Sequence, residues 1–395
     1  MTVITDTEAL VRFCAEQRGA SFVAVDTEFM RERTYWPILC LVQVAGPTEA
    51  VAIDPLAPGI DLTPLLNLMA DESILKVFHA ARQDVEIFFN LSGTVPKPLF
   101  DTQIAAMVCG FGDAASYETL VAKLARASLD KSSRFTDWSH RPLTERQIRY
   151  ALADVVHLRT VYEELQQRLA SNGRAGWFAE EMTGLADPAT YRSEPSEAWR
   201  RFRLRGRIDA RYFGVLREVA AWREAAARQR NLPRGRIIKD EAVLEIAAHT
   251  PRTTEALARS RSLGKGVAEG RLGNEILQAV QRGLANSKAL EVPPPSRADT
   301  PPGLGPLIEL LRVLLKQRCE EHQVAQRLLA TTEDLEAIAA DDRASVPALF
   351  GWRYDIFGKD ALALKHGQLA LTVRRNRITL VEVAGGEPII PRGHG

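Results

Sequence analysis

The sequence predicts an α/β domain, with a mixed sheet flanked by helices, followed by two small, mainly helical domains. Three observations support this fold class. Short, apolar, β-rich runs alternate with helical stretches up to about residue 190. Beyond that point strand patterns largely stop, and helical patterns separated by turns follow. A proline-rich segment, VPPPSRADTPPGLGP, then divides the helical part in two.

The first domain is expected to span residues 1–190. Its first clear strand, SFVAVDTEF, is apolar on both faces, as a central strand is. Strands are expected at residues 21–29, 38–45, 50–56 and 74–80, and helices at 82–90 and 144–170. This mixture of strands and helices is typical of an α/β domain.

The remaining chain is expected to form two helical domains. The first covers residues 207–290, with turns at NLP (231–233) and TP (250–251). The proline-rich linker occupies residues 291–306, and the second domain residues 307–385. This second domain ends in one strand-like run, ALTVRRNRITLVEVA.

Charge is distributed unevenly along the chain. The net charge is +1, but residues 200–290 hold 20 Lys and Arg against 9 Asp and Glu, and the remainder holds 31 against 41. A strongly basic middle region favours a polyanionic partner. Solvated helix faces balanced by the acidic parts remain an equal alternative on charge alone.

The sequence favours a cytoplasmic protein without membrane contact. No apolar run reaches the roughly 18 residues that a membrane-spanning helix needs. The first ten residues carry acids where a signal peptide carries basic residues. The four cysteines are widely spaced and form no C-x-x-C pair, which indicates free thiols in a reducing compartment.

Four carboxylates and a tyrosine are the candidate site. Asp26 and Glu28 are two apart in the first strand, so both carboxylates leave the same face. Asp84 lies near the start of the next expected helix, and Tyr150 and Asp154 are four apart on a later helix. Alone, each has an ordinary structural explanation. Together, hard oxygen ligands without clustered His or Cys favour two divalent cations, Mg²⁺ or Mn²⁺.

The pattern D-x-E, then D, then Y-x-x-x-D resembles that of the DEDDy 3′→5′ exonucleases. VAVDTEFMRERTYWPILCLVQVA, KVFHAARQDVEIFF, LFDTQIAAMVCG and LDKSSRFTDWSHRPLTERQIRYALADVVHL are similar to segments of the ribonuclease D family. The resemblance implies a ribonuclease H-like nuclease domain. It also implies that Asp26, Glu28, Asp84 and Asp154 are metal ligands, and that Tyr150 orients the attacking water.

The resemblance further implies the substrate and products. The expected activity is two-metal hydrolysis that trims the 3′ ends of structured RNA precursors, such as tRNA, and releases nucleoside 5′-monophosphates. No small-molecule cofactor besides metal is expected. The resemblance also implies that Phe29 and Met30 contact the terminal nucleotide, with core packing as an equal alternative.

The segment LREVAAWREAAARQRNLPRGRIIKDEAVLEIAAHTP resembles an HRDC domain, a small helical module that binds nucleic acid. Residues 307–364 resemble a second, divergent copy. Two alternatives stay open at this point: a DNA 3′→5′ exonuclease of the same family, and a non-catalytic RNA-binding protein that keeps a relic site. The presence of all five catalytic-type residues argues against the second.

Overall fold

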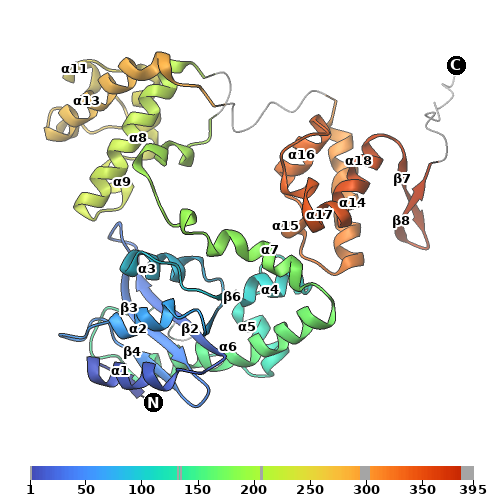
Figure 1. The fold of residues 1–395 in the computed structure, drawn as a ribbon. Coiled ribbons are helices and arrows are strands. Elements are labelled where there is room, and N and C mark those ends of the chain that lie inside the picture. Colours follow the sequence, from blue (N-terminus) through green and yellow to red (C-terminus); the bar gives the residue numbers. More distant parts are fainter. Residues whose placement is uncertain (1, 131–132, 134–135, 205–207, 294–302, 384–395) are drawn as a thin grey trace.

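The computed structural model describes all residues except 1, 131–132, 134–135, 205–207, 294–302 and 384–395. Most of the proline-rich linker therefore lies outside the described residues. The N-terminal lobe holds the sheet, and two helical lobes follow it (Figure 1). None of the helices in the described part is both long enough and apolar enough to cross a membrane.

A six-stranded mixed sheet forms the centre of the N-terminal lobe, in the order β1-β4-β3-β2-β5-β6. Strand β2 pairs antiparallel with β3 and parallel with β5, so it is a central strand, as the sequence predicted. The strands are β1 (Thr2–Ile4), β2 (Phe22–Met30), β3 (Ile38–Ala45), β4 (Ala50–Ile53), β5 (Leu75–Phe78) and β6 (Leu99–Asp101). Strands β1 and β6 were not predicted.

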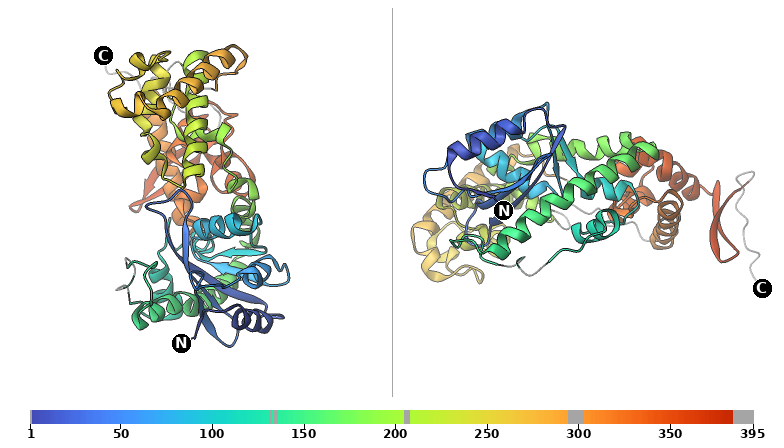
Figure 2. Two further views of the ribbon diagram at one scale, coloured as in Figure 1. Left: turned by 90° about the vertical axis from the view of Figure 1, so that its left-hand side faces the viewer. Right: turned by 90° about the horizontal axis from the view of Figure 1, so that it is seen from below.

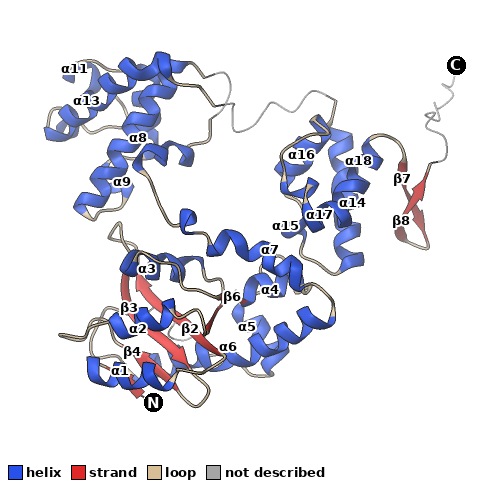
Figure 3. Cartoon of the chain, viewed as in Figure 1, coloured by secondary structure: helices blue, strands red, loops and turns tan. Residues whose placement is uncertain are grey.

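Helices cover both faces of this sheet (Figure 3). On one face, Val23 and Val25 of β2 pack with α1 (Thr7–Glu16), α2 (Thr63–Ala70) and α3 (Arg82–Ser92). On the other face, Ala24 packs with α4 (Thr102–Val108) and α6 (Glu145–Ser171). Helix α6 begins with a capping box, in which Thr144 and Gln147 satisfy each other's backbone N–H groups. Asp26 follows Ala24 by two residues and so faces α6.

The first helical lobe is built on α8 (Ala210–Arg230) and α13 (Arg271–Asn286), with α9 (Arg234–Ile237) and α10 (Asp240–His249) packed beside α8. The two turns expected from sequence are present. Asn231 and Thr250 adopt the left-handed conformation, with φ of 49° and 46°, and end α8 and α10.

The second helical lobe is formed by α14 (Gly305–His322), α16 (Thr332–Ala340), α18 (Lys359–Lys365) and the short helices between them. It ends in two strands, β7 (Leu369–Arg374) and β8 (Arg377–Glu382), which pair antiparallel. The single strand-like run expected here was therefore wrong, because Arg375 and Asn376 take positive φ and turn the chain back. The hairpin projects outward from the lobe (Figure 2).

Both helical lobes contact the N-terminal lobe. A segment that includes α7 (Ala175–Ala186) carries the chain away from α6 and meets the second lobe. There, Trp177 stacks on Trp352 with ring centroids 4.4 Å apart, and Arg353 pairs with Glu180 at 2.9 Å and with Glu181. The first lobe contacts the loop between β2 and β3, where Tyr35 packs with Ala226 and Ile237.

Candidate metal centre

Three of the predicted carboxylates converge between the sheet and α6. Asp26 and Glu28 come from β2 and Asp154 comes from α6, and each offers an oxygen within 4.8 Å of the other two. The alternation of β2 and the helical spacing of α6 place these side chains on facing surfaces. The donor set is made of hard carboxylate oxygens, which fits Mg²⁺ or Mn²⁺.

The fourth carboxylate stands apart from this group. Asp84, in the first turn of α3, accepts a hydrogen bond from the hydroxyl of Thr27. Thr27 lies between Asp26 and Glu28 on β2 and so points to the opposite face of the strand. The pKa of Asp84 is raised well above its usual value. Burial is the larger cause, and the negative charge of nearby Asp26 is the second.

The carboxylate groups hold protons more tightly than in water. Loss of solvation raises the pKa of Asp26 to about 6. The pKa of Asp154 rises to about 8, through burial and then through the charge of Asp26. The pKa of Glu28 rises to about 9, through burial and then through its carboxylate neighbours, Asp26 first. Acids that repel one another in this way favour a cation between them, so this cluster is a candidate metal centre.

A pocket of about 440 Å³ opens beside the cluster. Asp26, Asp154 and Tyr150 line it together with His79 and Tyr117. The structure therefore brings Tyr150 to the carboxylates, as the sequence predicted. The ring of Tyr150 packs beside that of Trp138, with centroids 6.0 Å apart.

Phe29 and Met30, the two residues expected to contact the terminal nucleotide, both pack against apolar clusters. Phe29 packs against the core between the sheet and α1–α3, and Met30 packs against a small cluster that includes Trp138. Neither is among the described residues that line the pocket. The pairing of β2 with β3 shifts register between Glu28 and Phe29, which ends the strict alternation at the end of the acidic strand.

Several residues at the site were missed from sequence. Asp101, 3% exposed, accepts hydrogen bonds from Ala80 N at 3.0 Å and Ala81 N at 2.9 Å. It thereby holds Ala80 at a φ of 56°, in the tight turn that leads into α3 and Asp84. The hydroxyl of Tyr117 donates to the backbone carbonyl of Asp154. The one feature of the sequence that could have indicated Asp101 is an acid directly after the apolar residues Leu99 and Phe100. A carboxylate is costly to bury, so its presence there suggests that it has hydrogen-bond partners.

His79 and Gln43 are two further polar groups near the carboxylates. His79 Nδ1 lies 3.0 Å from Thr102 Oγ1, and burial lowers the pKa of His79 to about 4, so its ring is neutral at pH 7. Gln43 of β3 is fully buried, and neither atom of its amide has a hydrogen-bond partner among the described residues. A glutamine inside the apolar run ILCLVQVA was the available signal for it.

Comparison with known proteins agrees with this geometry. Residues 1–170 match the 3′-5′ exonuclease family, and residues 213–280 match the HRDC domain family. Ribonuclease D of Granulibacter bethesdensis is 50% identical over 382 residues, covering 96% of each chain. Ribonuclease D of Gluconacetobacter diazotrophicus is 51% identical over 384 residues, covering 95% of each chain.

A solved structure extends the likeness to three dimensions. The crystal structure of Escherichia coli RNase D, described as an exoribonuclease involved in structured RNA processing, matches with a TM-score of 0.77 and 28% identity. The match covers 92% of this chain and 99% of that chain. The chain therefore belongs to the ribonuclease D family.

Proposed function

We propose that this exoribonuclease removes nucleotides from the 3′ ends of structured RNA precursors, tRNA precursors among them, by metal-dependent hydrolysis that releases nucleoside 5′-monophosphates. The observation that carries the proposal is the convergence of Asp26, Glu28 and Asp154 beside a pocket lined by Tyr150. The family relationship supports RNA as the substrate class.

Asp26, Glu28, Asp84 and Asp154 would hold two divalent cations, Mg²⁺ or Mn²⁺. Bound there, the cations supply positive charge that offsets the negative charge of the scissile phosphate and acidifies water. Asp26 of β2 and Asp154 of α6 both line the pocket, which supports placing the scissile phosphate beside them. The hydroxyl of Tyr150 orients the attacking water. Phe29 and Met30 support this end of β2, and their contact with the terminal nucleotide remains part of the proposal.

The helical lobes would supply affinity for RNA. The first helical lobe contains residues 213–280, which match the HRDC domain family, and most of the basic region 200–290. We assign the domains as 1–190, 207–290 and 307–385, with the third as a divergent HRDC-like module. The four cysteines form no disulfide in the structure, which fits the cytoplasm as the place of action.

One experiment separates this function from its alternatives. A matched pair of RNA and DNA oligonucleotides, labelled at the 5′ end, is digested with Mg²⁺ or Mn²⁺, and again with EDTA. Stepwise shortening of the RNA from its 3′ end, abolished by EDTA and by a blocked 3′ hydroxyl, is the expected result. Faster digestion of the DNA would identify the DNA exonuclease. Binding of RNA without digestion under every metal condition would identify a relic site.

A further inference from the structure

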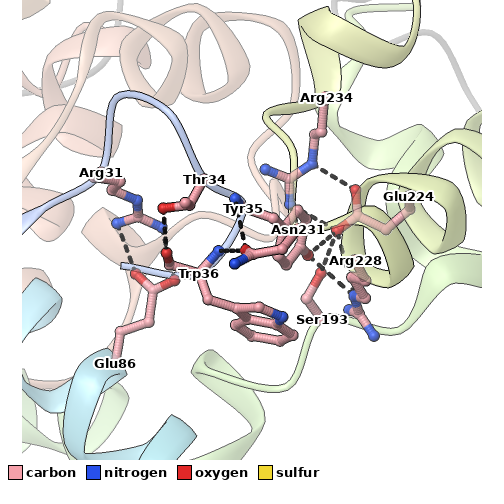
Figure 4. A network of polar contacts seen from close by, with 10 residues as sticks. All are labelled: Arg31, Thr34, Tyr35, Trp36, Glu86, Ser193, Glu224, Arg228, Asn231 and Arg234. Carbon is pink, nitrogen blue, oxygen red and sulfur yellow. Dashed lines mark hydrogen bonds and ion pairs between the residues drawn. The ribbon is translucent and has the colours of Figure 1, made fainter. Parts of the chain in front are cut away.

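The loop that follows the acidic strand is inserted into the first helical lobe (Figure 4). This docking loop, residues 31–37, joins β2 to β3. Tyr35, at its tip, is 8% exposed and packs with Ala226, Ala227 and Ile237 of the helical lobe. Its neighbours in space are therefore about 190 residues away in sequence.

The hydroxyl of Tyr35 completes a charged network in that lobe. It donates to Glu224, which is 1% exposed, and accepts from Arg228 Nε at 3.0 Å and Arg234 at 3.1 Å. Arg234 also pairs with Glu224, and these partners lower the pKa of Glu224 to about 2 despite its burial. Because Glu224 is buried, its charge needs these partners.

A second contact holds the backbone of the loop. Asn231 Oδ1 accepts from Tyr35 N and from Trp36 N, both at 3.1 Å (Figure 4). Asn231 ends α8 in the left-handed conformation, which asparagine tolerates better than most residues. That conformation aims its side chain at the loop.

The base of the loop is held separately, inside the nuclease lobe. Arg31 makes a two-pronged contact with Glu86 of α3, at 2.7 and 2.9 Å. Helix α3 also carries Asp84. The base of the loop is therefore held by the same helix that positions this carboxylate. The tip can therefore lose its contacts while the base and the carboxylates stay in place.

Four cations between the end of α8 and the start of α10 differ in what they contact. Arg228 and Arg234 turn toward Tyr35 and Glu224. Arg236 and Lys239, just beyond them, are exposed and make no ion pair among the described residues. The inward arginines place the lobe, and the outward cations are left to meet phosphate.

We propose that Tyr35 and Asn231 are positioning residues that set the first helical lobe against the nuclease lobe, so that RNA leaving the carboxylate pocket meets the exposed cations of that helical lobe. The inference about RNA rests on the proposed function; the inference about placement does not.

Two variants test the docking with little other change. Tyr35→Phe removes the hydroxyl and keeps the ring. Asn231→Gly keeps the left-handed turn, which glycine adopts readily, and removes only the acceptor. The matched control is Asn274→Gly, on an exposed position of α13. It weakens a helix of the same lobe slightly, by roughly 0.3 kcal/mol, without touching the loop.

The first measurement is the rate of digestion of a short single-stranded RNA and of a long hairpin RNA with a 3′ overhang. In the double variant we expect KM for the long RNA to rise about tenfold, because the substitutions remove the five hydrogen bonds that hold the docking loop against the helical lobe. We expect kcat, and both constants for the short RNA, to stay within twofold of the wild type. Equal losses on both RNAs would overturn the proposal, since they would place these residues in support of the active site itself. Unchanged constants on both would also overturn it.

The second measurement is independent of activity. Small-angle X-ray scattering of the full chain should show a longer maximum dimension in the double variant than in the wild type or Asn274→Gly. An unchanged distance distribution would overturn the placement. Should the wild type fail to digest the short RNA while the scattering changes as expected, the proposed function would fail and the placement would stand.

Discussion

Gln43 lies directly opposite Asp26 in the antiparallel pairing of β3 with β2. Residues in this relation place their Cβ atoms about 4.5–5.5 Å apart on one face of the sheet. The amide of Gln43 is fully buried and has no partner among the described residues. It is thus a hydrogen-bond donor beside a carboxylate of the metal centre, available to orient that carboxylate.

Replacing Gln43 by Leu should stabilise the metal-free protein and weaken its metal site. An unpaired buried amide costs about 1–3 kcal/mol. We therefore expect the free energy of unfolding in EDTA to rise by about 1 kcal/mol. Groups that orient metal ligands typically contribute about 10–100-fold to metal affinity. Denaturant unfolding and Mn²⁺ titration measure the two effects. Leu41→Met, opposite Glu28 on the same strand, is the control. Wild-type Mn²⁺ affinity in Gln43→Leu would contradict the role.

Asp26→Asn should abolish turnover and leave the protein folded. The substitution removes the charge that contributes to the raised pKa values of Glu28 and Asp154. Carboxylate repulsion in the metal-free protein then falls, so its free energy of unfolding should rise at pH 8. Activity in saturating Mg²⁺ and thermal unfolding in EDTA check both statements. Wild-type activity of this variant would show that the carboxylate cluster is not the metal centre.

Stabilisation by Mg²⁺ should increase with pH. The pKa values of Asp26, Asp154 and Glu28 are about 6, 8 and 9, above the values near 4 of unfolded chains. Protons therefore stabilise the folded state. This stabilisation is complete below about pH 4 and is lost as pH rises through 6 to 9. The same rise frees the ligands for the cation, so the Mg²⁺-induced increase in Tm should be larger at pH 9 than at pH 6. An increase independent of pH would exclude these carboxylates as ligands.

Tyr150→Phe should lower kcat by about 10²–10⁴-fold, as expected for loss of a group that positions a proton or water. The ring and its packing on Trp138 are kept, so RNA affinity should change little. Single-turnover rates and equilibrium binding in EDTA separate the two quantities. Weaker binding with a normal single-turnover rate would assign Tyr150 to substrate binding.

Local periodicity was enough to predict much of this site. The period of two places Asp26 and Glu28 on one face, and the spacing of four places Tyr150 and Asp154 on one face of α6. Strands β1 and β6 have three residues each, too few to show a period. The contacts of Asp84 with Thr27 and of Tyr35 with Glu224 join segments 57 and 189 residues apart. Such contacts depend on strand register and lobe placement, which no local pattern encodes.

The exposed cations of α9 and the adjoining turn should account for part of the salt dependence of RNA binding. Deleting the helical lobes would test this poorly, because it would strip the partners from Tyr35 and Trp177. The sharper change is Arg236→Ala with Lys239→Ala, which removes two exposed charges.

For single-stranded RNA the slope of log affinity against log salt is about −0.7 for each phosphate neutralised, so the double variant should flatten the slope by about 1.4. Arg282→Ala is the matched control, because Arg282 already pairs with Glu218 at 3.1 Å. Binding is measured in EDTA over a range of salt, on an RNA long enough to reach both lobes. If the double variant and the control flatten the slope equally, general surface charge explains the binding. If neither does, the cations beyond Arg234 do not contact RNA, and the path of the substrate across the first helical lobe lies on another face.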